Sequence, residues 1–280
     1  MSSNKNYKTG ETILCVDKVS IGYPDEKNNG KIKLVLKDIS LIEKDIIRDG
    51  IEATGQTVAF LGRSGRGKST FFKSLTGLVK PTSGSILITD MNGGAQAVKE
   101  GGVGFVDQKY TLFRHKTINQ SFYYSLRKSK KTNQEKTDTV NKYLNDWGLM
   151  EHKDKFPCEL SGGQRQRSAV ISQILSSKHF IVFDEPFSGL DIPAIENVKE
   201  AFKKYQSENE YDTIIFSTHD IKLAVELADS IYVIGFPEGT TEYSTILKHF
   251  DLKAMGLAWE EYGDGHRNVC QDIKDLLMKS

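Results

Sequence analysis

The sequence lacks the features of membrane-spanning, secreted and strongly charged proteins. Its 280 residues include only three cysteines, Cys15, Cys158 and Cys270, whose wide spacing excludes a disulfide framework and a CxxC metal site. The 38 Lys and Arg residues balance 37 Asp and Glu residues, which leaves no whole-surface field suited to nucleic acid. No apolar run approaches the roughly 18 residues of a bilayer span, and the N-terminal MSSNKNYKTGE has no hydrophobic core for a secretion signal. We therefore expect a cytosolic protein.

Short apolar runs alternate with helical patterns along most of the chain. Hydrophobic residues make up 38% and charged residues 27%, which is typical of a folded domain. The alternation predicts an α/β fold with a mostly parallel sheet covered on both faces. Strands are predicted at 12–21, 34–41, 57–61, 85–89, 103–106, 180–183, 213–216 and 230–234, and helices at 69–78, 164–175, 193–205 and 221–228.

Four stretches depart from this alternation. The segment from 111 to about 156 is polar, Lys-rich and helix-like, and predicts a helical subdomain inserted at about 111–167 into a domain of residues 1–236. Residues 25–30 predict a turn, and residues 41–56 predict an extended polar surface loop. Residues 237–280 predict a short C-terminal tail, with a short helix at 247–259 that packs on the core.

The first motif with a chemical meaning is a glycine-rich loop between a predicted strand and a predicted helix. Gly62–Ser69 fits G-x-x-x-x-G-K-[ST], and both flanks match the context that this motif requires. Its backbone N–H groups would surround phosphate oxygens, Lys68 would contact the β- and γ-phosphates, and Ser69 would ligate Mg²⁺. An ordinary glycine-rich turn is the disfavoured alternative. The predicted nucleotide-binding residues are Gly62, Arg63, Ser64, Gly65, Arg66, Gly67, Lys68, Ser69 and Thr70.

Two acidic residues follow the predicted buried strand at 180–183. Asp184 and Glu185 would lie at the carboxyl end of the sheet, where nucleotide sites of α/β folds occur. Asp184 would hold Mg²⁺ through its water shell, and Glu185 would polarise an attacking water as general base. Taken alone, two acids at a strand end are more often a helix cap. Downstream of a phosphate loop, we favour the catalytic interpretation.

A third motif is Leu160–Gln164, LSGGQ, immediately before a predicted helix. Ser161 is a good N-cap residue, and the two following glycines allow close backbone approach at the positive end of the helix. Local physical chemistry favours a plain capped turn here, with a second anion site as the alternative.

These motifs and four others occur in the order found in ABC-type ATPases, which the chain resembles over about residues 12–235. The LSGGQ segment resembles the family signature, residues 62–69 the Walker A loop and residues 180–184 the Walker B strand. The remaining matches are Tyr23 with the adenine-stacking aromatic, Gln108 with the Q-loop glutamine, residues 188–191 with the D-loop and His219 with the switch histidine.

The resemblance implies a P-loop NTPase core with an N-terminal β-rich subdomain and the inserted helical subdomain. It implies ATP hydrolysis with Mg²⁺, in a head-to-tail dimer of the chain with itself or a paralogue. Gln108 would sense Mg²⁺ and the attacking water, and His219 would contact the γ-phosphate and orient Glu185. Ser161 and Gly163 would clamp the γ-phosphate of the partner's nucleotide, and the predicted nucleotide-binding residues of this segment are Ser161, Gly162, Gly163 and Gln164.

The family includes two classes of function that suit this chain. We favour the ATPase subunit of an ABC transporter, peripheral on the cytoplasmic face of the membrane and docked near Gln108 on a separate transmembrane permease subunit. The segment 217–229 is most similar to importers of small anions such as nitrate, sulfonates and bicarbonate, which use a solute-binding protein. The alternative is a soluble single-cassette ATPase with an accessory role. An intact Glu185 argues against a pure nucleotide sensor.

Three positions depart from the family pattern. Arg66 stands where a small residue is usual, and its side chain either adds charge near the phosphates or faces solvent. Asp107 replaces the usual aromatic or aliphatic residue before the Q-loop glutamine. The predicted loop at 43–53 is longer than the usual tight turn and is either a neutral insertion or a partner contact.

Overall fold

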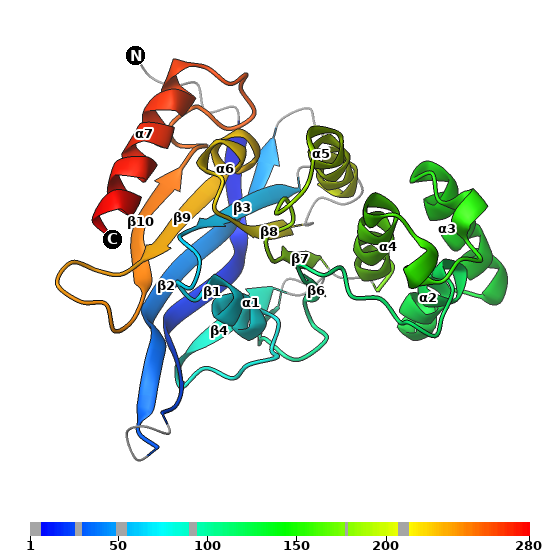
Figure 1. The fold of residues 1–280 in the computed structure, drawn as a ribbon, viewed down its shortest axis with the longest axis horizontal. Helices are drawn as coiled ribbons and strands as arrows, with labels where there is room; N and C mark the ends of the chain where they lie inside the picture. Colours follow the sequence, from blue (N-terminus) through cyan, green and yellow to red (C-terminus); the bar gives the residue numbers. More distant parts are fainter. Residues whose placement is uncertain (1–6, 26–29, 49–54, 90–93, 177–178, 207–212) are drawn as a thin grey trace.

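The computed structural model describes residues 7–25, 30–48, 55–89, 94–176, 179–206 and 213–280. Within these residues the chain forms two sheets, with a group of helices extending to one side (Figure 1). None of the helices in this part of the chain is both long and apolar enough to cross a membrane.

The larger sheet has six strands in the order β10-β9-β3-β8-β7-β6. Strands β3, β6, β7, β8 and β9 pair in parallel, and β10 pairs antiparallel with β9. Every residue of β3, β7, β8 and β9 is buried, which explains why these strands read as continuous apolar runs. The predicted parallel sheet is confirmed. The strands span Gln56–Leu61 (β3), Gly104–Val106 (β6), Phe180–Phe183 (β7), Thr213–Thr218 (β8), Ser230–Gly235 (β9) and Thr245–Asp251 (β10).

The smaller sheet is antiparallel, with strand order β2-β1-β4-β5. It covers one face of the larger sheet together with helix α1 (Lys68–Leu75) through an apolar cluster that includes Phe60, Phe71 and Phe72. Its long hairpin reaches well beyond the main sheet (Figure 1). The strands span Tyr7–Pro24 (β1), Ile32–Arg48 (β2), Ser83–Thr89 (β4) and Ala95–Ala97 (β5).

The prediction of a loop from residue 41 is wrong for residues 41–48, which continue strand β2. Buried and exposed residues alternate there with a period of two, as a strand covered on one face requires. Glu43 and Asp45 are buried in this strand, and buried acidic residues hide the apolar alternation that would have revealed it. Residues 49–54 and residues 26–29 of the predicted turn lie outside the described residues.

The predicted helix-like stretch forms the helical group at one end of the molecule (Figure 1, green). It comprises α2 (Ile118–Ser125), α3 (Asn133–Asp146) and α4 (Gly162–Ile174). Each helix begins with a reciprocal capping box, which satisfies N–H groups that have no partner within the helix. Phe122 and Leu144 are fully buried in its core, which continues into the face of the main sheet opposite α1. Helices α5 (Ile192–Gln206) and α6 (Ile221–Leu227) cover the rest of that face.

The C-terminal segment differs from the prediction of a short helix at 247–259, which is wrong. Residues 245–251 form β10, because the free edge of β9 offers backbone partners to an extended segment. Gly256 and Trp259 then adopt positive φ angles of 69° and 67°, which a helix does not contain. The helix lies later in the chain, as α7 (Asp264–Lys279), and packs against α6 and β9.

A buried polar cluster joins strand β2 to this C-terminal segment. The Glu43 carboxylate is 3% exposed and accepts hydrogen bonds from Tyr232 (2.6 Å) and Ser230 (2.8 Å). Because Ser230 Oγ donates to Glu43, His249 Nε2, 2.7 Å away, is the donor to Ser230. Lys253 Nζ lies 3.9 Å from Glu43 Oε2. Burial, and next the Glu43 charge, raise the pKa of Tyr232, so its hydroxyl remains a donor.

Replacing Tyr232 by Phe tests the energetic role of this cluster. Phe retains the stacking on Phe60 and His249 but leaves Glu43 buried with one donor fewer, so we expect the free energy of unfolding to fall by about 1–3 kcal/mol. Urea unfolding measures the change. Tyr243→Phe is the matched control, since the Tyr243 ring contacts Lys37 through its face. Equal losses in both variants would contradict a role for the Glu43 bond.

Candidate functional site

The glycine-rich loop connects the end of β3 to the start of α1 in a backbone conformation that glycine makes possible. Gly65 and Gly67 have φ angles of 79° and 86°, in the left-handed region. A Cβ atom on Gly62 would lie 2.5 Å from the carbonyl oxygen of Ile234 at the end of β9. The first glycine therefore allows the loop to pack directly against β9, and the others allow it to turn into the helix.

This loop forms one wall of a cavity of 550 Å³. The structure brings together here several residues that the sequence predicts for the site, from the segments that follow β6, β7 and β8 as well as from the loop. The cavity is lined by Val35, Ser64, Gly65, Arg66, Gly67, Lys68, Ser69, Thr70, Gln108, Glu185, Ser188 and His219.

Lys68 is the buried charge of the cavity, with 6% of its surface exposed. Its ammonium group donates to the carbonyl oxygens of Gly62 (2.7 Å) and Arg63 (3.3 Å) and lies 3.2 Å from Glu185 Oε1. A buried cation needs such compensation, because desolvation of the charge is costly. The first turn of α1 contains no acidic residue, so the positive end of the helix dipole also faces the cavity without internal neutralisation.

The two acids after β7 have different surroundings. Asp184 Oδ1 accepts a hydrogen bond from Ser217 Oγ (2.8 Å), and the same hydroxyl accepts from the Glu185 N–H (2.9 Å). Glu185 has a φ of 52°, which costs about 1–3 kcal/mol for a residue with a side chain. Its Oε2 atom lies 2.9 Å from His219 Nδ1, so one carboxylate bridges the lysine and the histidine.

Gln108 and Asp107 lie where β6 leaves the sheet. Gln108 Nε2 donates to Ser188 Oγ (3.2 Å), which links the two loops that close this side of the cavity. The Asp107 carboxylate binds the N–H (3.0 Å) and hydroxyl (2.6 Å) of Thr111 within its own loop. The unusual acid at position 107 therefore stabilises the turn that leads to the helical group.

Two further residues of the site have no signal in the sequence motifs. Ser217 lies in the buried strand β8, and its position two residues before His219 was the available clue. Tyr110 donates to the Pro186 carbonyl (2.7 Å) and accepts from Gln166 Nε2 (2.8 Å), which ties the helical group to the loop after Glu185. Burial raises the pKa of Tyr110 to about 12, so this hydroxyl stays protonated.

Eight predicted residues do not line the cavity. Gly62, Arg63 and Asp184 only adjoin lining residues in the chain, whereas Tyr23 and Ser161–Gln164 lie elsewhere. Tyr23 is 43% exposed near the end of β1 and pairs with Lys33, two residues before the cavity residue Val35. Ser161, Gly162, Gly163 and Gln164 lie at the start of α4 in the helical group, where Ser161 and Gln164 form the capping box. Gly162 lines a different groove, of 820 Å³, together with Gln108 and the segment that follows it.

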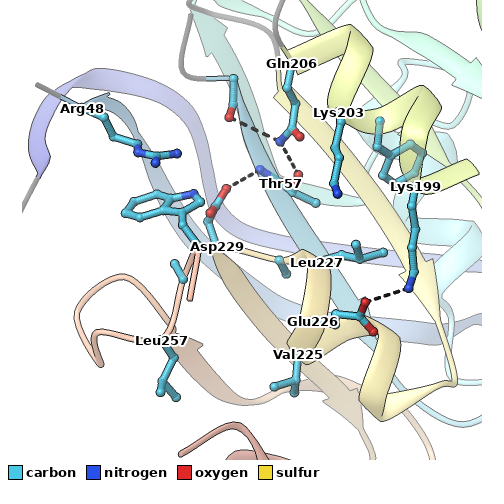
Figure 2. A pocket seen from close by; sticks show the side chains of 15 residues that line it. Arg48, Thr57, Lys199, Lys203, Gln206, Val225, Glu226, Leu227, Asp229 and Leu257 are labelled. Atoms are coloured by element: carbon cyan, nitrogen blue, oxygen red, sulfur yellow. Dashed lines mark hydrogen bonds and ion pairs between the residues drawn. The ribbon is translucent and has the colours of Figure 1, made fainter. Parts of the chain in front are cut away.

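A second cavity, of 320 Å³, lies at the opposite, amino end of β3 (Figure 2). Asp229 lines it and accepts a hydrogen bond from the Thr57 N–H (2.7 Å), while Lys199 pairs with Glu226 (2.7 Å). Burial raises the pKa of Asp229 to about 6. This cavity is separated from the glycine-rich loop by the length of the strand.

Comparison with known proteins identifies the family. A sequence profile described as "ABC transporter" matches residues 52–188. The sulfate/thiosulfate import ATP-binding protein CysA of Pectobacterium atrosepticum is 34% identical over 235 residues, which cover 81% of this chain and 69% of that protein. Its counterpart in Synechococcus elongatus is 36% identical over 182 residues, covering 65% and 53%. The chain belongs to the ATP-binding proteins of ABC transporters.

The fold agrees with this assignment. The structure of cbiO1 from Clostridium perfringens, described as part of the ABC transporter complex cbiONQ, superimposes with a TM-score of 0.68 at 26% identity. The match covers 89% of this chain and 92% of that one. The predicted P-loop fold of the ABC ATPase type is therefore confirmed. The chain spans about half the length of several curated relatives that it matches.

The raised pKa of Asp229 predicts a pH-dependent contribution to stability. Below about pH 3 the carboxyl is protonated in both folded and unfolded chains. As the pH rises to about 6 the unfolded chain ionises first, so this contribution to the free energy of unfolding falls by on the order of 3 kcal/mol. Asp229→Asn retains an acceptor for Thr57 and removes the titration.

We therefore expect Asp229→Asn to gain stability relative to the parent chain between pH 4.5 and pH 7.5. Urea unfolding of both chains at the two pH values measures this gain. A stability difference that does not change with pH would refute the assignment of this titration to Asp229.

Proposed function

We propose that this chain is the ATP-hydrolysing subunit of an ABC transporter. The observation that supports this proposal most directly is the meeting of Lys68, Glu185 and His219 at a glycine-rich loop, within one cavity. A phosphate loop without a positioned carboxylate would suit binding alone. Here the carboxylate lies within 3.2 Å of the lysine that would hold the phosphates.

The phosphates of ATP would bind at the start of α1, where backbone N–H groups and Lys68 face the cavity. The Lys68 ammonium would then exchange its Glu185 partner for phosphate oxygens. Glu185 would keep its contact with His219 Nδ1. Its other carboxylate oxygen, no longer paired with Lys68, would accept a proton from the attacking water. The constrained backbone of Glu185 limits where this carboxylate can move.

Ser69 and Asp184 would hold Mg²⁺. Their hydroxyl and carboxylate oxygens are the hard ligands that this ion prefers, and both lie next to the proposed phosphate position. Bound there, Mg²⁺ would neutralise charge on the β- and γ-phosphates. Ser217 holds the Asp184 carboxylate in place with its 2.8 Å hydrogen bond. Tyr23, at the end of β1, would stack on the adenine.

The signature residues would act on a second chain. Ser161–Gln164 do not line the cavity of their own chain, and they sit at the exposed start of α4. In a head-to-tail dimer with a second copy or a paralogue, this helix end would close over the partner's nucleotide. The dimer would close when ATP binds and open after hydrolysis, and this alternation would be the mechanical cycle of the transporter.

A transmembrane permease subunit would dock in the 820 Å³ groove between Gln108 and the helical group. That position would couple the docked subunit to the Gln108–Ser188 contact beside the nucleotide. The chain would then lie on the cytoplasmic face of the cell membrane. Because relatives are named as sulfate/thiosulfate import proteins, we propose a small oxyanion as the imported solute, delivered by a solute-binding protein.

Glu185→Gln tests the proposed catalytic role. Glutamine cannot act as a base, so we expect ATP hydrolysis to fall by about 10²–10⁴-fold while Mg-ATP still binds. Lys68→Ala should instead abolish tight Mg-ATP binding. Phosphate release and calorimetric titration measure the two effects, with Glu196→Gln on the exposed side of α5 as control. Hydrolysis by Glu185→Gln at the parent rate would refute the role of this residue.

Recovery of partners from native membranes tests the transport role. Tagged Glu185→Gln, captured from membranes in mild detergent, should bring down a polytopic membrane protein that mass spectrometry identifies. Capture of soluble partners alone, with the chain absent from membranes, would overturn the transport proposal in favour of a soluble accessory ATPase.

A further inference from the structure

Arg66 occupies an unusual place in the glycine-rich loop. It lines the cavity, yet its guanidinium group lies over the ring of Phe236, with Cζ 3.7 Å from the ring centroid. Phe236 directly follows β9, 170 positions along the chain from Arg66. Arg66 is half-buried, and a residue from a distant segment holds its side chain at the wall of the cavity.

Both members of this pair are held in place by their neighbours. Arg66 stands between two glycines with left-handed φ angles, and a Cβ on Gly67 would lie 2.9 Å from Leu36. Phe236 is anchored two residues after Ile234, whose carbonyl oxygen touches the loop at Gly62. The guanidinium group is thus positioned before any ligand arrives, which lowers the entropic cost of binding one.

Within the described part of the chain, the positive charge of Arg66 has no anionic partner. Among the described residues no carboxylate lies within ion-pair distance of it, and its buried Nε atom has no hydrogen-bond acceptor. The acid of the cavity, Glu185, already contacts Lys68 and His219. An arginine stacked on an aromatic face keeps its edge N–H groups directed outward, so it can bind an anionic acceptor supplied by a ligand.

The strand order indicates which part of a nucleotide this acceptor would be. In the main sheet β9 and β8 flank β3 on opposite sides, and β7 lies beyond β8. Glu185 and His219 follow β7 and β8, so the reacting γ-phosphate belongs on their side of the loop. Phe236 and Arg66 lie on the β9 side, toward the α- and β-phosphates that ATP and ADP share.

We propose that Arg66, positioned by Phe236, is a second cationic ligand of the nucleotide that binds the α- and β-phosphate oxygens. This inference rests on the proposed function and adds a residue that determines nucleotide affinity. Because ADP retains these phosphates, Arg66 strengthens the binding of product as well as substrate. The segment after β9 thereby takes part in forming the nucleotide site.

Arg66→Ser, which introduces a small residue, tests the proposal. We expect the affinities for Mg-ATP and for ADP, measured by calorimetry, to fall by a similar factor of about 10–100, as for loss of a hydrogen bond between charged groups. The dependence of affinity on salt concentration should also become weaker, because one cationic contact is lost. A purely structural role would not change that dependence.

Companion variants keep the test decisive if Arg66→Ser folds poorly. Arg66→Lys should retain part of the affinity, and Phe236→Ala should lower it although Arg66 is present. Lys248→Ser is the matched control, because Lys248 also lies over an aromatic ring, that of Phe250, and belongs to β10 rather than to the lining of the cavity. It removes one positive charge and should leave both affinities unchanged.

Two results would overturn the inference. Unchanged ATP and ADP affinities in Arg66→Ser and Phe236→Ala would show that the charge contacts no nucleotide. Loss of ATP affinity alone would place Arg66 at the γ-phosphate, against the strand-order argument. A parent chain that binds neither nucleotide would instead refute the proposed function, and is distinguishable because it is measured before any variant.

Discussion

The architecture of the site depends on a buried ammonium group at the start of α1. Lys68 is compensated by two carbonyl oxygens of its own loop and by the Glu185 carboxylate, which arrives from the other side of the cavity on β7. This requirement for compensation brings the loop and the acid together. A phosphate that replaces Glu185 beside Lys68 would compensate the ammonium charge and release the Glu185 carboxylate. Nucleotide binding and activation of Glu185 as a base would therefore follow from one exchange of partners.

The two ends of the main sheet adjoin different cavities. The cavity lies at the carboxyl ends of β3, β7 and β8, whereas the second cavity, around Asp229, adjoins the amino ends of β3 and β9. The helical group is attached to the site through Tyr110, whose hydroxyl contacts both Gln166 and Pro186. The long β1–β2 hairpin and the C-terminal segment are joined through Glu43. A few polar contacts set in an apolar core thus connect these elements.

Much of this arrangement could be predicted from the sequence, because its central strands are continuous apolar runs and its loops carry short motifs next to them. The predictions failed where polar residues occupy buried positions, as Glu43 and Asp45 do in β2. They failed again at residues 247–259. The spacing of Leu252, Met255 and Trp259 is typical of a helix, but residues 245–251 pair with the open edge of β9 and form a strand. Contacts between distant segments, such as Arg66 with Phe236, have no local signal.

The central claim is that the cavity beside Lys68 binds a nucleotide through its phosphates. Calorimetric titration of the parent chain with Mg-ATP, repeated in the presence of inorganic pyrophosphate, tests it most directly. The account predicts one site per chain and a loss of apparent ATP affinity as pyrophosphate competes for the loop. Binding of ATP that pyrophosphate does not affect, or no binding at all, would contradict it.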